Sequence, residues 1–146
     1  YLEDVTNVVS LRLFNLYGKY QKHDFIVPHI IKQALESSNV VVKDLEPKRD
    51  YLYIKDMVSL IDIIINSNSA NGIYNVGSGK SFSVGQVIDI IEDILNKPLN
   101  ARASNVRRES EVMDCYADIS RLKKDFDWTK QYSLKNGLTD YIKEIN

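Results

Sequence analysis

Apolar and polar positions alternate along this chain with two different periodicities. Short runs rich in β-branched and aromatic residues indicate strands, whereas longer stretches with apolar residues three or four positions apart indicate helices. The runs that indicate strands cover residues 8–14, 40–42, 49–54, 73–76 and, at a sheet edge, 100–105. The stretches that indicate helices begin at or near Pro28, Asp56, Ser83, Asp118 and Ser133. Strands and helices therefore alternate, which is typical of an α/β fold.

Polar residues ahead of the helical stretches indicate where the helices begin. Ser83 and Gln86 have the spacing of a capping box, in which each side chain bonds the backbone N–H of the other residue. Asp56, Asp118 and Ser133 each precede an apolar stretch as a candidate N-cap. These signals predict the starts of four helices.

The first and fourth predicted strands are separated by a long crossover that contains helices. Parallel strands need a connection of this kind, so we expect 8–14 and 73–76 to lie in one mostly parallel sheet. The crossover is expected to carry a small lobe built from 40–42 and 49–54.

Side chains alternate strictly in the strand predicted over 49–54. Tyr51 and Tyr53 fall on one face of this strand, and Leu52 and Ile54 fall on the other. Further along the chain, Trp128 is expected to fill the core between the last two helices.

Composition narrows the class of protein. The chain has 146 residues, which favours one domain, and it is 44% hydrophobic and 27% charged with a net charge of −1. This balance argues against a broad nucleic-acid surface, which needs a basic patch.

The single cysteine, Cys115, excludes an internal disulfide and suits a reducing compartment. Residues 1–6 lack the features of a signal peptide and no apolar run is long enough to span a membrane, so we expect a soluble, cytoplasmic protein.

The glycine-containing segment 77–81 lies between a strand and a helix and invites comparison with a phosphate-binding P-loop. The full P-loop motif needs glycine five positions before Gly79, where Tyr74 stands. Lys80 also precedes the best helix cap, Ser83, so it would not open the helix as a P-loop lysine does. We therefore interpret the segment as a tight glycine turn rather than as the site of a P-loop nucleotide hydrolase.

Arginines and acids offer candidate binding chemistry. On pattern alone, Arg49 is best explained as a surface ion pair with Asp50 or Glu46, and Arg108 near Glu111 as a solvated charge run. The alternative is that the planar guanidinium groups bind phosphate. Two arginines and a carboxylate would suit a nucleoside diphosphate, with the acid accepting hydrogen bonds from the ribose hydroxyls.

The two histidines and the cysteine are not assigned to any functional site. His23 and His29 have no partners at metal-ligand spacing, so no metal site is expected. Cys115 has no adjacent base in sequence and is expected to be a small buried residue.

Several motifs in their order along the chain resemble one enzyme family. The segments that carry the resemblance are 11–18, 25–28, 49–56, 73–79, 108–118 and 126–138. They are similar to the C-terminal half of extended short-chain dehydrogenases/reductases of the NAD-dependent epimerase/dehydratase type. The resemblance implies the last strands and helices of a Rossmann-like parallel sheet together with a small α/β substrate-binding lobe. We expect residues 1–146 to be this substrate-binding part, with the N-terminal NAD-binding part absent.

The resemblance also implies roles for individual residues. Asn15 would contact the diphosphate or the sugar and also the cofactor, and Phe14 would lie near the nicotinamide of NAD or NADP. Arg49 and Arg108 would bind the diphosphate, and Glu111, where the family usually has aspartate, would hold the ribose hydroxyls. The remaining substrate-binding candidates are Val27, at the base pocket, and Tyr51.

Catalytic residues of the family have no counterpart in this sequence. The glycine-rich dinucleotide fingerprint is absent, and no Tyr-x-x-x-Lys pair falls on a suitable helix. The expected function is therefore the nucleotide-sugar-binding portion of an NAD-dependent epimerase or dehydratase, inactive by itself. The resemblance also implies a homodimer for the complete enzyme, since members of the family often dimerise. A stand-alone, non-catalytic nucleotide-sugar-binding module is the alternative.

Overall fold

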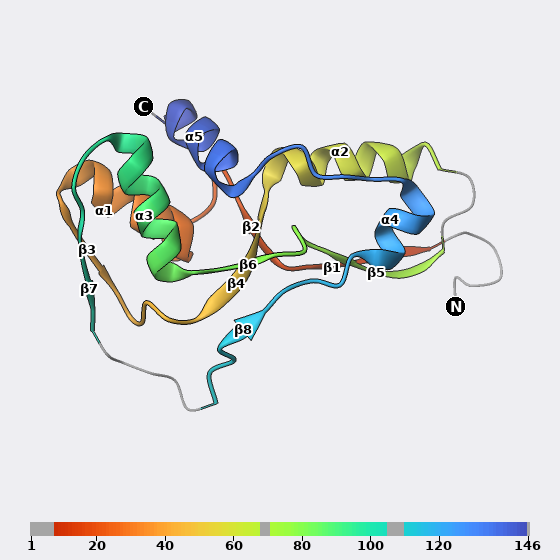
Figure 1. The fold of residues 1–146 in the computed structure, drawn as a ribbon. Coiled ribbons are helices and arrows are strands. Elements are labelled where there is room, and N and C mark those ends of the chain that lie inside the picture. Colours follow the sequence, from red (N-terminus) through yellow and green to blue (C-terminus); the bar gives the residue numbers. More distant parts are fainter. Residues whose placement is uncertain (1–7, 68–70, 105–109, 146) are drawn as a thin grey trace.

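The computed structural model describes residues 8–67, 71–104 and 110–145. The strands are β1 (Val9–Leu13), β2 (Asn15–Tyr17), β3 (Asn39–Val42), β4 (Lys48–Tyr53), β5 (Gly72–Val76), β6 (Ser81–Ser83), β7 (Asn100–Ala103) and β8 (Asp114–Cys115). The helices are α1 (Ile26–Glu36), α2 (Ile54–Ile65), α3 (Val84–Leu95), α4 (Ser120–Phe126) and α5 (Leu134–Ile145). Strands and helices alternate along the chain, which confirms the α/β prediction (Figure 1).

Within the described residues, the strands form three small sheets. β1 pairs with β5 in parallel, which confirms that the strands predicted at 8–14 and 73–76 share a sheet. β3 pairs with β7, also in parallel, and β4 pairs with β2, β6 and β8. The segments 40–42 and 49–54, expected to build a small lobe, do share one core, in which Val40, Val42, Tyr51 and Tyr53 are buried, although β3 takes β7 and not β4 as its strand neighbour. A strand's partner depends on contacts between distant segments, which local sequence patterns do not encode.

Two groups of elements lie at opposite ends of the molecule (Figure 1). We call α1, α3, α5, β3 and β7 the lobe, and β1, β5, α2 and α4 the strand-pair region. β4 runs between them and contributes to both cores. Tyr51 and Tyr53 belong to the core of the lobe, whereas Leu52 belongs to the core of the strand-pair region. The alternation predicted for Tyr51, Leu52 and Tyr53 is thus confirmed and joins the two cores, whereas Ile54 begins α2 and packs against both.

The lobe has a well-covered core. Ile30, Ile91 and Leu138, from α1, α3 and α5 respectively, are each 0% exposed. α3 begins with the predicted capping box, in which Ser83 and Gln86 bond each other's backbone N–H groups. Buried side chains three or four positions apart on each helix face this shared core, as in amphipathic helices: α1 packs against β3 and α3, and α5 packs against α3 and β4.

The strand-pair region is less completely covered. Trp128 was expected between the last two helices, but it joins the core of this region, and its Nε1 donates to Ser59 Oγ of α2 at 3.2 Å. On the outer side of α2, Val58, Ile61 and Ile65 are 58%, 41% and 75% exposed. Among the residues that the structure describes, β1 is paired only with β5, so its other edge is open.

Asp56 does not cap α2 as expected. The helix begins two residues earlier at Ile54, and Asp56 is buried in its first turn. Its carboxylate accepts hydrogen bonds from the backbone N–H groups of Gln131 at 2.7 Å and Tyr132 at 3.3 Å. Burial raises the pKa of Asp56, while those two donors lower it. This acid therefore fixes the approach to α5 instead of starting its own helix.

The other two predicted caps lie close to their helices. Ser133 Oγ accepts from Asn136 N at 3.1 Å, directly before α5, as predicted. Asp118 stands one residue outside the cap position of α4, yet its carboxylate accepts from Ser120 N at 3.0 Å. None of the helices within the described parts of the chain has both the length and the apolar character needed to cross a bilayer.

A buried carboxylate joins β4 to two distant segments. Asp50 is 0% exposed, and its oxygens accept from the backbone N–H groups of Ser78 at 2.6 Å, Gly79 at 2.9 Å and Ala117 at 3.0 Å. A side chain at Gly77 would meet Asp50 Oδ2 at 2.5 Å and Ala117 Cβ at 2.7 Å, which explains the glycine. Because this turn donates its N–H groups to Asp50, it cannot cradle a phosphate, and the tight-turn interpretation is confirmed.

Candidate functional site

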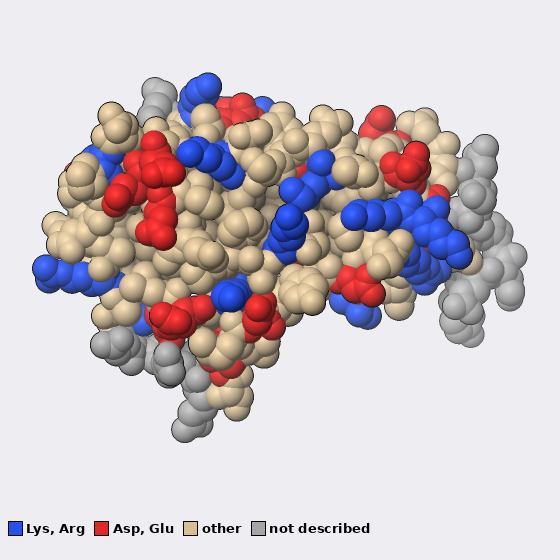
Figure 2. Space-filling model, in the orientation of Figure 1, with Lys and Arg blue, Asp and Glu red and all other residues tan. Residues whose placement is uncertain are grey.

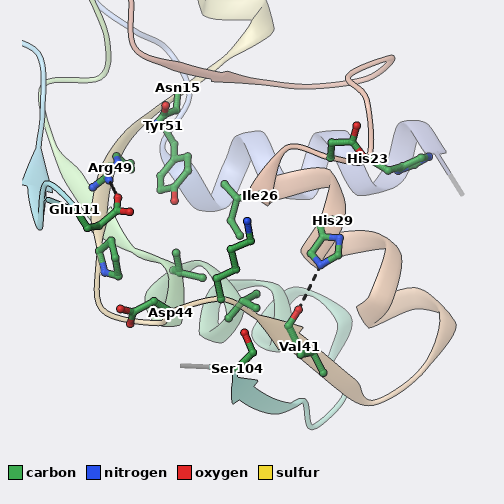
Figure 3. Close-up of a pocket in the computed structure, with 15 residues that line it drawn as sticks. Asn15, His23, Ile26, His29, Val41, Asp44, Arg49, Tyr51, Ser104 and Glu111 are labelled. Atoms are coloured by element: carbon green, nitrogen blue, oxygen red, sulfur yellow. Dashed lines mark hydrogen bonds and ion pairs between the residues drawn. The ribbon is translucent and has the colours of Figure 1, made fainter. Parts of the chain in front are cut away.

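A cavity of about 600 Å³ lies between β4 and the lobe (Figure 3). Lys43 and Ser104, which follow the carboxyl ends of β3 and β7, line it, and Ile26 lines it from the start of α1. Ligands of α/β proteins commonly bind beyond the carboxyl ends of parallel strands. The position of this cavity is therefore typical of a binding site.

One wall of the cavity brings together residues from three segments of the chain. Asn15 comes from β2, Arg49 and Tyr51 come from β4, and Glu111 comes from the segment before β8. Asn15 lies directly beside Tyr51 in the parallel β2–β4 pairing. Four of the six substrate-binding candidates named from the sequence thus line one cavity (Figure 3).

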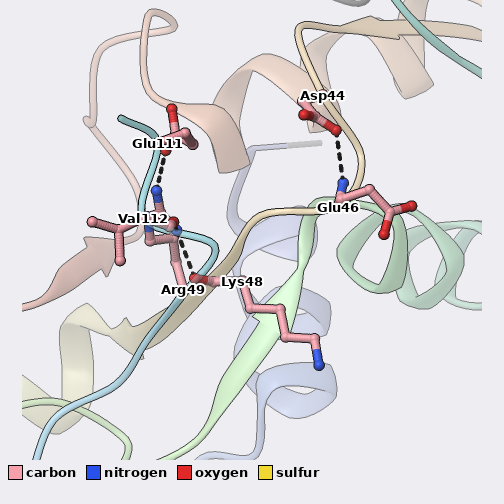
Figure 4. Close-up of polar contacts among 6 residues, drawn as sticks. All are labelled: Asp44, Glu46, Lys48, Arg49, Glu111 and Val112. Atoms are coloured by element: carbon pink, nitrogen blue, oxygen red, sulfur yellow. Dashed lines mark hydrogen bonds and ion pairs between the residues drawn. The ribbon is translucent and has the colours of Figure 1, made fainter. Parts of the chain in front are cut away.

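Arg49 is held by its neighbours in a defined position. Its Nη1 donates to Lys48 O at 2.8 Å and to Val112 O at 2.5 Å, and its Nη2 forms an ion pair with Glu111 (Figure 4). The ion pair expected with Asp50 or Glu46 is not the one formed, because Asp50 faces the buried turn and Glu46 points away from the guanidinium. The pairing of β8 with β4 places Glu111 close to Arg49.

Tyr51 presents a buried hydroxyl to the cavity. Its side chain points into the space drawn in Figure 3, and the residue is only 3% exposed. Within the described residues, no hydrogen-bond partner contacts the hydroxyl. Burial raises the pKa of Tyr51 to about 12, with the charge of Arg49 acting in the opposite direction. The group is therefore a neutral hydrogen-bond donor, and buried donors normally have a partner, which a bound ligand can supply.

The opposite wall is formed by the start of α1 and the end of β3. Val27 was expected at the base pocket, but it is 2% exposed within the core of the lobe, and the adjacent Ile26 lines the cavity instead. Successive helix positions differ by about 100°, so a one-residue difference decides between core and cavity. His29 also lines this wall, with Nε2 3.3 Å from Val41 O.

Histidines at the cavity were not identified from the sequence. His23 and His29 both line it, although neither was assigned a site. Their position depends on how the loop before α1 folds against β3. Their sequence neighbours carry no signal of this contact. Only the three-dimensional arrangement identifies them as lining residues.

Like Val27, Phe14 is not among the residues that line the cavity. Phe14 lies between β1 and β2, where its backbone N donates to Val76 O at 3.0 Å and its side chain packs on the core of the strand-pair region. Arg108 lies outside the described residues. The proposed roles of Phe14 and Arg108 therefore remain predictions.

Charges of both signs surround the cavity. Lys43 and Arg49 supply positive charge, and Asp24, Asp44 and Glu111 supply negative charge. Lysines, arginines and acids are also interspersed over the face of the molecule in Figure 2. The cavity therefore suits a polar ligand with a localised anionic group near Arg49 better than a long polyanion, which requires a continuous basic surface.

The chain is similar to known proteins along nearly its whole length. Residues 3–141 match the family model described as GDP-mannose 4,6 dehydratase. The chain is 29% identical to CDP-abequose synthase of Salmonella muenchen over 94% of its length, and 32% identical to the uncharacterized UDP-glucose epimerase YtcB of Bacillus subtilis over 92%. It covers 48% and 43% of those two proteins, so it spans about half the length of the curated relatives it matches.

Solved structures are also similar to this chain along nearly its whole length and extend to about twice its length. The UDP-glucuronic acid 4-epimerase of Bacillus cereus, in complex with UDP-glucuronic acid and NAD, is 27% identical with a TM-score of 0.78. The alignment covers 94% of this chain and 46% of the epimerase chain. RMD from Pseudomonas aeruginosa, in complex with NADPH, has a TM-score of 0.83 at 24% identity and supports the fold.

Proposed function

This chain belongs to the GDP-mannose 4,6 dehydratase family, and we propose that it is the nucleotide-sugar-binding portion of an NAD- or NADP-dependent epimerase or dehydratase. One observation carries the proposal. The cavity wall gathers Asn15, Arg49, Tyr51 and Glu111 from separate segments beyond the ends of parallel strands. A cation, a hydroxyl donor, an amide and a carboxylate are the groups that a nucleoside diphosphate sugar requires.

Each residue has a role in this proposal. Arg49 would bind the diphosphate, together with Arg108. Asn15 would contact the diphosphate or the sugar, and Tyr51 would donate its unpartnered hydroxyl to a ligand oxygen. Glu111 would accept hydrogen bonds from the ribose hydroxyls, and the base would lie toward the opposite wall, where Val27 was expected and Ile26 is exposed to the cavity. Binding energy at these groups holds the sugar in the orientation that reaction requires.

The dinucleotide cofactor would meet this chain only at one side. Phe14 and Asn15 stand at the carboxyl end of β1, where ligands of α/β sheets bind, so they fit the proposed contact with the nicotinamide end. The glycine turn after β5 does not fit the cofactor's phosphates, because Ser78 and Gly79 donate to Asp50. The bound cofactor supplies hydride transfer. The residues of this chain bind and orient the sugar.

Further parts of the proposal concern the whole protein. We propose that residues 1–146 act as the C-terminal, substrate-binding part of an isomerase or lyase of carbohydrate metabolism, in the cytoplasm and as a homodimer. This chain alone is expected to show no turnover and no tight binding of NAD, since it lacks the dinucleotide fingerprint and the Tyr-x-x-x-Lys pair. Micromolar binding of NAD to the 146-residue chain in calorimetry would contradict that expectation.

Calorimetric titration with UDP, dTDP, GDP and CDP tests the proposed site. At least one nucleoside diphosphate should bind, and Arg49→Ala should weaken it by about tenfold to a hundredfold, since a charge-assisted hydrogen bond contributes about 1.5–3 kcal/mol. Arg12→Ala is the matched control, because Arg12 lies on β1 and bonds Asn75 instead of lining the cavity. Binding of none of the four, or an equal loss in both variants, would reject the proposal.

A further inference from the structure

In the ion pair between Arg49 and Glu111, the carboxylate binds the guanidinium group that a ligand phosphate would need. A guanidinium group has five N–H donors in one plane. Both hydrogens of Arg49 Nη1 have a backbone carbonyl in reach, at Lys48 and Val112, and Nη2 donates to Glu111. Among the described residues, no hydrogen bond engages Nε or the second Nη2 hydrogen, so these two donors remain for a ligand. A phosphate that binds through both nitrogens of that edge must therefore share Nη2 with Glu111 or displace it.

Carboxylate and phosphate compete for the same geometry. Both present two oxygens to the guanidinium fork, and both carry negative charge. Side chains of Arg49 and Glu111 are 26% and 21% exposed, so water screens their interaction only in part. A second anion placed at this edge would lie next to the Glu111 carboxylate and be repelled by it.

We propose that Glu111 is an internal substitute for a ligand phosphate: it neutralises Arg49 in the free protein and leaves the guanidinium when a diphosphate binds. This inference rests on the proposed function for the identity of the ligand. The two backbone contacts of Nη1 keep Arg49 in place during the exchange, because they do not involve Glu111. The released carboxylate is then available to the ribose hydroxyls of the same ligand. Glu111 is thus a positioning residue that lowers affinity for a bare anion and favours an anion attached to ribose.

Inorganic pyrophosphate is the appropriate probe, because it carries the diphosphate without ribose or base. Glu111→Gln should bind pyrophosphate on the order of tenfold more tightly than the unmodified chain, which is about 1.4 kcal/mol. Glu111→Ser removes the same carboxylate with different packing and should give the same gain. The matched control is Glu46→Gln, which changes the net charge equally at an exposed acid that points away from Arg49 (Figure 4). The control should change pyrophosphate affinity by less than about twofold, since Glu46 is exposed to solvent, which screens its charge, and it makes no contact with Arg49 in Figure 4.

A double-mutant cycle decides whether Glu111 acts through Arg49. In an Arg49→Ala background, replacing Glu111 by glutamine should no longer increase pyrophosphate affinity. A gain no larger than that of Glu46→Gln, or a gain that persists without Arg49, overturns the inference.

The outcome is separable from that of the proposed function. Nucleoside diphosphate binding with no pyrophosphate gain in either Glu111 variant would reject the exchange alone. A pyrophosphate gain that requires Arg49, in a chain that binds none of the four nucleoside diphosphates, would support the exchange and reject the proposed function.

Discussion

The lobe and the strand-pair region bury their apolar side chains to different extents. In the lobe, Ile30, Ile91 and Leu138 are fully inaccessible to solvent. In the strand-pair region, Leu13 and Ile73 are 47% and 54% exposed, and the outer side of α2 is apolar. The candidate cavity is built mainly on the lobe and on β4. We therefore expect ligand binding to depend on the well-covered region and association with other chains to depend on the open one, so the two properties can be tested separately.

The largest effect is expected from one substitution made in both regions. Leu138→Ala should destabilise the chain by about 3 kcal/mol, because it leaves a cavity in a closed core. Leu13→Ala should cost less than about 1 kcal/mol, because the Leu13 side chain is already half in water. Urea unfolding measures both free energies. Equal losses would show that the strand-pair region is as closely packed as the lobe.

A loss of nearly the same size is expected at the Asp50 junction, by which we mean the hydrogen bonds from Ser78, Gly79 and Ala117 to the carboxylate of Asp50 on β4. Asp50→Ala removes the acceptor of three backbone N–H groups, of which that of Ala117 is buried and the other two are partly buried, so the loss should lie near the low end of about 1–3 kcal/mol for each, roughly 3 kcal/mol in all. Asp89→Ala, at an exposed position of α3, is the control and should stay within about 0.5 kcal/mol. If unfolding midpoints of the two variants coincide, the junction is not a stabilising contact.

Two neighbouring tyrosines on β4 should separate stability from binding. Tyr53 donates its hydroxyl to Asp140 at 2.9 Å, so Tyr53→Phe should cost about 1 kcal/mol of stability and leave nucleotide affinity unchanged. Tyr51→Phe should leave stability unchanged, because no partner contacts its hydroxyl within the described residues, and should weaken nucleotide binding several-fold. Chemical denaturation and calorimetry of the two variants provide the comparison. A stability loss at Tyr51 with no change in affinity would argue against its role in the site.

The smallest change in stability is expected on the outer side of α2. Val58→Ser combined with Ile65→Ser should alter the free energy of unfolding by less than about 0.5 kcal/mol, since both side chains are largely exposed. The same pair should reduce self-association, because exposed apolar patches and open strand edges favour contact with other chains. Sedimentation velocity across a concentration series measures the effect.

Val112→Ser changes an equally exposed valine outside the strand-pair region and serves as the control for association. A chain that stays monomeric at high concentration, or one whose association the control reduces equally, would show that the α2 surface does not mediate contact.

Features that depend on local sequence were predictable. The alternation of strands and helices, the Ser83 capping box and the two faces of β4 all follow from periodicity or short-range hydrogen bonding. The features that were missed depend on distant segments. β3 takes β7 as its partner, and Asp56 bonds the chain 75 residues later. The residues adjacent in sequence do not indicate either contact.

The candidate site divides in the same way. Arg49, Tyr51, Asn15 and Glu111 were named from motifs, and the structure places them around one cavity. Val27, expected at the base pocket, is buried in the core of the lobe and the neighbouring Ile26 lines the cavity, because packing against the core sets which helix positions face outward. Motif resemblance identifies the candidate site residues, and the fold determines which of their side chains reach the cavity.

The Asp50 junction has a consequence for how the molecule folds in time. Its carboxylate meets partners 28, 29 and 67 residues away, so two long loops must close before the contact forms. Contacts of such large sequence separation slow folding when they are needed early. A contact completed after the transition state acts instead on the unfolding rate. We therefore expect this junction to form late and to determine how long the native chain, once assembled, survives before it opens.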